Sequence, residues 1–207
     1  MNTLEQAGVI PMDYAVLRSI YSDYSFPQNK IANLEQEGKV IRLKKGLYVV
    51  SPNINNQLLS AELIANHLYG PSYVSMESAL RYYGLIPERV YTIRSMTTKR
   101  SKKFENSIGN FEYIGIKENY YPIGIKRQME GSEYAFIIAT PEKALCDIIS
   151  ETRGVKIQSA KVLEEYLEDD LRLDTSRLSD MDSSIVEECI KTGKKKRALK
   201  LLLKLLR

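Results

Sequence analysis

The hydrophobic pattern in the first fifty residues changes its period at Gly38. Before this glycine, Ile31 and Leu34 lie three residues apart among polar neighbours, which is the spacing of a short amphipathic helix with one buried stripe. Pro27 suits the first turn of such a helix, because its missing N–H would be unpaired there in any case, and a glycine suits the C-terminal end. The pattern therefore predicts a helix over 28–37.

After this glycine the period becomes two, and the alternation predicts a small hairpin that turns at Lys45-Gly46. Its predicted inner face consists of Val40, Leu43, Leu47 and Val49, and its basic residues are Lys39, Arg42, Lys44 and Lys45. A helix followed at once by a basic-tipped hairpin is typical of the second half of a winged helix-turn-helix. In that fold the helix enters the major groove and the hairpin lies along the phosphates. The alternative is an ordinary helix and hairpin whose lysines only face solvent.

The chain divides at a polar stretch over 52–56 that begins with a proline. Upstream, Asp13 suits the N-cap of a support helix, whose predicted buried face is Tyr14, Leu17, Ile20 and Tyr21. We predict a winged helix-turn-helix domain over 1–52 and a larger α+β domain over 57–207. The support segment before Pro27 is short, so a full three-helix unit would need residues 1–11.

The larger domain is predicted to contain a small antiparallel sheet packed on helices. The predicted helices cover 58–68, 76–83 with Ser75 as N-cap, and a segment that begins at Pro141 with Thr140 as N-cap. The predicted strands lie within 89–98, 104–116, 123–127 and 134–138. The fold class is therefore α+β, with helices at the C-terminus.

Charge is unevenly distributed over the last fifty residues. Residues 159–188 carry ten acids and three bases, and residues 191–207 carry eight bases and no acid. The last segment reads as an amphipathic basic helix, and we favour the interpretation that its leucines dock on the core. The alternatives are a helix that binds a partner and a helix that lies on a membrane surface.

Composition argues against an enzyme. The single histidine, His67, lies in an apolar helix and is expected to be a core or interface residue, and Cys146 and Cys189 are expected to be free thiols facing the core. No GxSxG, P-loop or GxGxxG is present, and Glu142-Lys143 lacks the spacing of a nuclease. We expect no cofactor and no metal. Without a signal-peptide pattern or an apolar run near about 18 residues, the sequence predicts a cytoplasmic protein. Its net charge of +4 says little, so nucleic-acid binding depends on where the bases lie.

Two sets of motifs together go beyond a generic winged helix. The first is the hairpin, GKV at 38–40 and KGLYV at 45–49. The second is SYVSMESAL at 72–80, GLIPE at 84–88, TTKR at 97–100 and TPEKAL at 140–145. In this order they resemble the AbiEi family, the antitoxins of type IV toxin–antitoxin (abortive-infection, phage-defence) systems. The resemblance covers roughly residues 13–150.

The resemblance implies a transcriptional repressor that binds inverted repeats of double-stranded DNA in its own promoter, with no membrane partner. It implies a nucleotidyltransferase-like toxin that the protein opposes without a stable complex, and it suits a monomer that binds DNA cooperatively. The candidate DNA-binding residues are Gln28, Asn29, Lys30, Asn33, Lys39, Arg42, Lys44, Lys45, Arg94, Lys99, Arg100, Lys102 and Lys103. The alternative function is a protein-interaction module that uses the winged helix as a scaffold and binds an acidic partner or the toxin.

Overall fold

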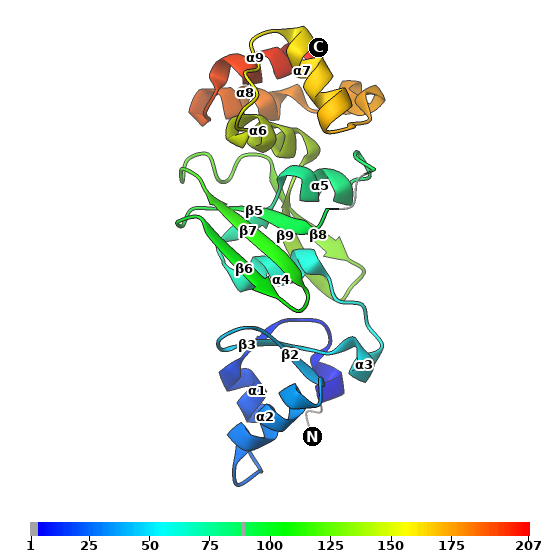
Figure 1. Cartoon of the computed structure of the whole chain (residues 1–207), viewed down its shortest axis with the longest axis vertical. Helices are drawn as coiled ribbons and strands as arrows, with labels where there is room; N and C mark the ends of the chain where they lie inside the picture. Colours follow the sequence, from blue (N-terminus) through cyan, green and yellow to red (C-terminus); the bar gives the residue numbers. More distant parts are fainter. Residues whose placement is uncertain (1–3, 88–89) are drawn as a thin grey trace.

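The protein has an α+β fold, seen in a computed structural model that describes residues 4–87 and 90–207. Figure 1 shows three parts along its long axis: an N-terminal unit, a central sheet and a group of C-terminal helices. Helix α4 (Ala61–Leu68) lies between the sheet and the N-terminal unit, and α5 (Met76–Tyr82) and α6 (Pro141–Glu151) lie toward the C-terminal helices.

The N-terminal unit is a small sheet covered by short helices. Its elements are η1 (Leu4–Ala7), β1 (Met12–Asp13), α1 (Tyr14–Ile20), α2 (Pro27–Gln36), β2 (Val40–Lys44) and β3 (Leu47–Val50). The strands are antiparallel in the order β1-β3-β2. Asp13 caps α1 as predicted, since its Oδ1 accepts from the Val16 N–H at 2.9 Å. Of the predicted lead-in, residues 1–3 lie outside the described residues, and Leu4 is buried in the core of this unit.

Strand β3 is buried on both faces and contributes to two cores. Tyr48 and Val50 pack with α1 and α2, whereas Leu47 and Val49 join the core of the rest of the molecule. This alternation follows the period of two in a strand. The prediction that Val40 shares one inner face with Leu43, Leu47 and Val49 was wrong. Val40 lies an odd number of residues from each of these three, so its side chain points to the opposite face of the hairpin and packs with α2.

The connection after the hairpin is partly helical. Residues 52–56, predicted as a polar break, contain the short helix α3 (Pro52–Asn55), and Ser51 caps it. The next helix begins at Ala61 with Ser60 as its N-cap, later than predicted. Leu58 therefore lies outside the helix, and 89% of its surface is exposed.

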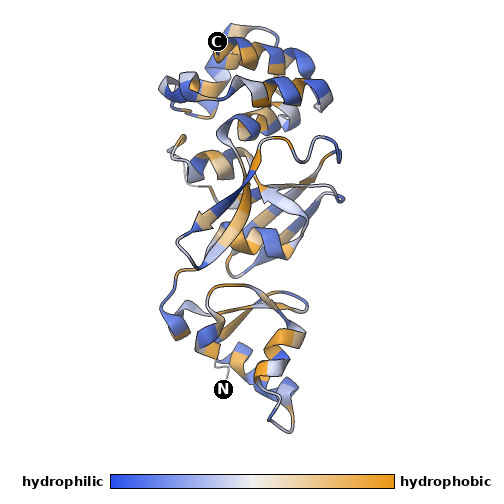
Figure 2. Ribbon diagram, turned by 180° about the vertical axis from the view of Figure 1, so that it is seen from behind, coloured by the Kyte–Doolittle hydropathy of each residue, from blue (hydrophilic) through white to orange (hydrophobic). Residues whose placement is uncertain are grey.

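The central sheet has six strands and is mixed, so the prediction of a small antiparallel sheet was wrong. Its strands are β4 (Ser72–Val74), β5 (Thr92–Thr97), β6 (Lys102–Asn106), β7 (Gly109–Gly115), β8 (Ile125–Glu130) and β9 (Tyr134–Ala139). The order is β6-β7-β5-β4-β9-β8, and the pairs β5–β7 and β4–β9 are parallel. These strands include some of the most hydrophobic stretches of the chain (Figure 2). Part of the predicted strand over 89–98 falls on Arg89, outside the described residues.

The C-terminal part is a helical layer on α6. Its further elements are α7 (Ala160–Glu165), the π-helical turn η2 (Tyr166–Asp170), the 3-10 helix η3 (Thr175–Asp180), α8 (Ser183–Thr192) and α9 (Lys196–Leu205). Thr140 caps α6 with Pro141 in its first turn, as predicted. Leu199 and Leu202 of the basic helix α9 are fully buried in the main core, so the prediction that its leucines dock there is confirmed.

A fully buried ion pair joins α6 to the sheet. Lys143 and Asp147 are both inaccessible to solvent, with Nζ and Oδ1 3.4 Å apart. Asp147 Oδ2 accepts from Ser75 Oγ at 2.6 Å and from Tyr73 at 3.0 Å, and Lys143 donates to the Tyr120 carbonyl at 3.0 Å. Ser75 occupies the N-cap position of α5 as predicted, but its hydroxyl donates to Asp147 and makes no capping hydrogen bond. Burial raises the pKa of Asp147, and Lys143 opposes that rise.

Candidate nucleic-acid interface

The exposed face of α2 carries amides. Its buried stripe is Pro27, Ile31 and Leu34. The opposite face consists of Gln28, Asn29, Ala32, Asn33 and Gln36, all exposed, and we call it the amide face. Their spacings of three and four residues place these side chains on one side of the helix. No amide of this face has a hydrogen-bond partner within the described part of the chain. The structure therefore places the predicted Gln28, Asn29 and Asn33 together, and it adds Gln36.

The two acids at the end of α2 are neutralised by cations of the hairpin. Arg42 forms an ion pair with Glu35 at 2.6 Å, and its guanidinium also lies 5.7 Å from the centre of the Tyr48 ring. Lys39 pairs with Glu37 at 2.7 Å, and this pairing lowers the pKa of Glu37. Two predicted DNA-binding cations are thus engaged with neighbours. Their effect is to remove negative charge beside the amide face.

Lysines from two distant stretches of sequence meet at the end of the hairpin. Lys44 donates to the Leu68 carbonyl at the C-terminal end of α4, at 2.5 Å. Lys99 donates to the Gly70 carbonyl, and Lys102 lies over the Phe104 ring at 4.8 Å from its centre. Burial lowers the pKa of Lys44, and the positive charges of Lys102 and Lys99 lower it further. We call these three residues the lysine cluster.

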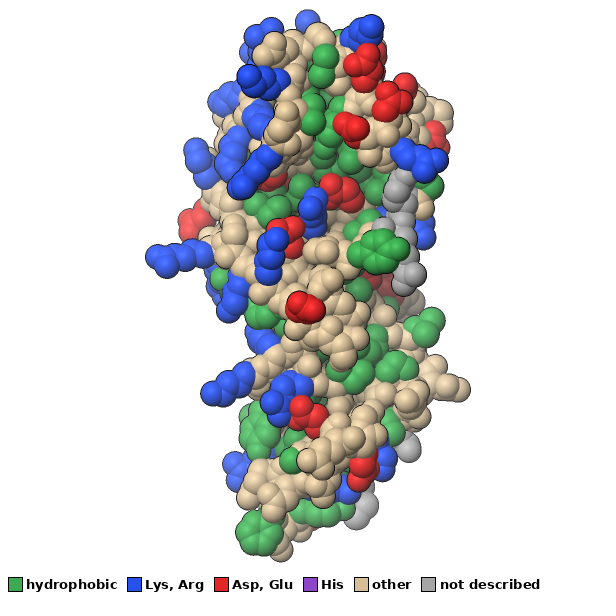
Figure 3. Space-filling model, in the orientation of Figure 1, with side chains coloured by type: hydrophobic (Ala, Val, Ile, Leu, Met, Phe, Trp, Pro, Cys, Tyr) green, Lys and Arg blue, Asp and Glu red, His purple; other side chains and the backbone are tan. Residues whose placement is uncertain are grey.

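The lysine cluster lies where the hairpin meets the central sheet. Lys99 and Lys102 both lie over the Tyr69 ring, at 5.4 and 5.6 Å from its centre. In addition, Asn106 of β6 donates to the Leu43 carbonyl of β2 at 3.1 Å. The predicted residues Lys45, Arg100 and Lys103 are exposed nearby on the same two segments. Lysine and arginine side chains gather along one edge of the molecule, from the C-terminal helices past the sheet to the N-terminal hairpin (Figure 3).

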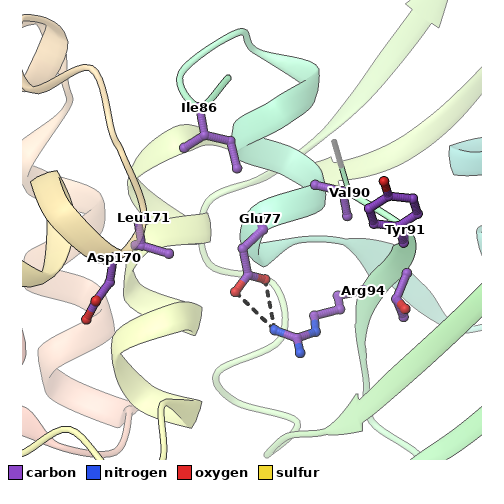
Figure 4. Close-up of a pocket in the computed structure, with 8 residues that line it drawn as sticks. Glu77, Ile86, Val90, Tyr91, Arg94, Asp170 and Leu171 are labelled. Carbon is purple, nitrogen blue, oxygen red and sulfur yellow. Dashed lines mark hydrogen bonds and ion pairs between the residues drawn. The ribbon is translucent and has the colours of Figure 1, made fainter. Parts of the chain in front are cut away.

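Arg94 differs from the other predicted DNA-binding cations because two carboxylates bind its guanidinium. Its guanidinium bonds both carboxylate oxygens of Glu77 at 3.0 Å and Glu112 at 3.1 Å, and Lys103 pairs with Glu112 at 2.9 Å. Figure 4 shows Arg94 pointing at Glu77 in the wall of a cavity of about 270 Å³ that Leu171 also lines. Arg94 was predicted to contact DNA, but its guanidinium is half-buried between two carboxylates. We therefore set Arg94 aside as a DNA contact.

Two further predictions concern single residues of the larger part. His67 is exposed, with Nδ1 3.0 Å from the Leu63 carbonyl oxygen, so it does not lie in the core; the alternative place in an interface stays a prediction. Cys146 and Cys189 are free and buried, as predicted. The buried pair of Lys143 and Asp147 was not predicted from the residue pattern. The only available signal was a lysine and an aspartate four residues apart on an otherwise apolar helix.

Neither a metal site nor a membrane span is found in the part of the chain that the structure describes. Within residues 4–87 and 90–207, no three His, Cys, Asp or Glu side chains are grouped so that they could hold a metal ion. Across the same residues, no helix combines the length and apolar character needed to cross a membrane.

Comparison with known proteins adds no identification. The sequence matches no protein-family model, and no curated protein matches it significantly. The features that bear on function are therefore the amide face, the lysine cluster and the motifs that resemble those of AbiEi antitoxins.

Proposed function

We propose that the chain is a DNA-binding transcriptional repressor whose N-terminal unit works as a winged helix-turn-helix. In this proposal α1 supports α2, α2 is the recognition helix, and the β2–β3 hairpin is the wing. The order of helix, helix and hairpin and the exposed polar face of α2 support it. The observation that supports it most strongly is that Lys44 of the hairpin lies beside Lys99 of the β5–β6 connection and Lys102 of β6.

The chemistry of this convergence suits a polyanion. Bringing three lysines together is electrostatically unfavourable: burial is the main cause of the lowered pKa of Lys44, and the charges of Lys102 and Lys99 lower it further. A phosphate backbone lying over the lysine cluster would relieve this repulsion and release counterions. With Lys45, Arg100 and Lys103 alongside, one strand of a duplex would meet cations from both segments while α2 lies in the adjacent major groove.

The experiment is a mobility-shift titration of the full chain on the DNA upstream of its own gene and on a scrambled duplex. Each titration is run at two salt concentrations. We expect a preference for the upstream DNA of about 10³-fold or more and a steep loss of affinity with salt. Weak and equal binding to both duplexes would contradict the proposal. A stably bound acidic protein without DNA affinity would instead establish the interaction module.

The antitoxin part of the proposal rests on the resemblance to AbiEi proteins. We propose that the chain counteracts a nucleotidyltransferase-like toxin encoded beside it without forming a stable complex. Coexpression should restore the growth of cells that produce the toxin, while affinity purification of either protein recovers it alone. Continued growth arrest despite equal expression would contradict this part and leave the repressor proposal standing.

A further inference from the structure

The amide face carries information about the DNA sequence that it would read. Among side chains that read bases in the major groove, arginine and lysine pair with guanine, whose O6 and N7 both accept hydrogen bonds. Asparagine and glutamine pair with adenine, because an amide offers one donor and one acceptor to match N7 and N6. The amide face holds four amides and no cation: Gln28, Asn29, Asn33 and Gln36.

The cations nearest to this face contact other side chains. Arg42 is bound to Glu35 and stacked on Tyr48. Lys30 borders the amide face, is half-buried, and has Nζ 5.6 Å from the centre of the Tyr24 ring. The amide face therefore has no lysine or arginine that could donate hydrogen bonds to both O6 and N7 of guanine.

Cytosine is disfavoured by the ion pairs at the end of α2. A carboxylate can read cytosine by accepting from its N4 amino group. Glu35 and Glu37 are the acids of this helix, and they are paired with Arg42 at 2.6 Å and Lys39 at 2.7 Å. Reading cytosine would require one of these pairs to break.

The remaining residue of the amide face suits thymine. Ala32 lies between the amides, one turn after Gln28 and one turn before Gln36. Its methyl group offers an apolar contact of the kind that recognises the 5-methyl group of thymine. We infer that α2 reads A·T base pairs, with Asn29 and Asn33 as the central adenine contacts. This inference rests on the proposed function.

The test is a selection from randomised duplexes with the full chain, followed by affinity measurements on the selected site. The variants are Asn29→Ala and Asn33→Ala, which remove an amide at exposed helical positions where alanine favours the helix. Asn119→Ala is the matched control, because Asn119 is an exposed amide in the larger part of the molecule. Adenines in the selected site are then replaced one at a time by 7-deazaadenine, which lacks the N7 acceptor and keeps the base pair.

We expect A·T pairs at the selected positions. One 7-deazaadenine should weaken binding about 5- to 150-fold for the unmodified chain and for the Asn119 control. The same base analogue should cause no further loss in the variant that lacks its matching amide.

Two results would overturn the inference and leave the repressor proposal intact. One is selection of guanine at the positions whose preference the Asn29 and Asn33 variants alter. The other is an A·T preference that both variants retain in full, which would reveal readout of groove shape. Equal binding to all duplexes, with no sequence enriched, would overturn the inference and the proposed function together.

Discussion

Replacing Lys143 by methionine should destabilise the protein strongly and in a pH-dependent way. Methionine keeps the length of the buried side chain and removes its charge, so Asp147 remains fully buried without its cation, 3.4 Å away in the intact pair. Removing one partner of a buried pair costs about 3–5 kcal/mol in the free energy of unfolding. For a chain of this size, that loss corresponds to a fall in Tm of about 6–20 °C.

The pH dependence follows from the pKa of Asp147. Burial raises this pKa in the folded protein, and Lys143 partly opposes the rise. Without Lys143 the pKa rises further, so the folded variant holds a proton that the unfolded chain releases above about pH 4. Folding then becomes less favourable as the pH increases toward the folded pKa. Lys143→Met should therefore lie closer to the unmodified protein at about pH 5 than at about pH 8.

The assay is urea denaturation followed by circular dichroism at both pH values. Lys161→Met is the matched control, because the side chain of Lys161 is 83% exposed and lies 3.8 Å from Glu165. It should change stability by less than about 0.5 kcal/mol. Asp147→Asn and the double variant complete a cycle whose coupling energy should be about 0.5–3 kcal/mol. A loss below about 1 kcal/mol for Lys143→Met, or a larger loss equal at both pH values, would refute this reasoning.

Three further predictions concern the lysine cluster and its support. The double variant Lys45→Ala, Lys102→Ala should reduce the slope of log affinity against log salt by about two, one for each lost phosphate contact; an unchanged slope would remove both from the interface. DNA phosphates should raise the lowered pKa of Lys44, so affinity should begin to fall with rising pH below the ordinary lysine pKa of about 10.4. In Lys44→Met the fall should begin at higher pH, and an identical pH profile in both proteins would contradict the role of Lys44. Gly115→Ala would place a Cβ 2.6 Å from the Lys99 carbonyl oxygen, so it should lower stability by about 1–3 kcal/mol in urea denaturation; an unchanged midpoint would contradict the clash.

Local sequence patterns predicted those helices and the hairpin whose ends carry an N-cap residue or a turn glycine. Asp13 and Thr140, both predicted as N-caps, each cap a helix with a side-chain oxygen that accepts from a backbone N–H. The hairpin turn at Lys45-Gly46 forms where the period of two is interrupted, and Gly46 has a φ of +81°. These features depend on residues within one turn of each other. They are therefore readable from sequence.

Pairing between distant segments was not readable in the same way. Strand β4 pairs in parallel with β9 through Val74 and Ile138, and no local pattern specifies such a partner. A short apolar run has the same appearance in a parallel and an antiparallel strand. The predicted sheet was therefore antiparallel throughout, whereas the structure has two parallel pairs.

The sequence predicted individual residues of the candidate site, but not the ion pairs and contacts between them. The sequence identified the amides of α2 and the basic residues of both segments. It could not show that Arg42 and Arg94 are bound to carboxylates, or that Lys44 meets Lys99. Such partnerships arise from tertiary contacts, and they decide which cations remain available to a ligand.

Because strand β3 packs into both cores, the N-terminal unit cannot be separated from the rest of the molecule without exposing apolar side chains. A fragment that ends at residue 52 would retain α2 and the hairpin but expose Leu43, Leu47 and Val49, which now lie in the main core. Such a fragment would carry an apolar strip near the amide face and would tend to associate with itself. Grafting α2 with its hairpin onto another protein therefore requires a surface that replaces α4, or polar substitutions along one side of the hairpin.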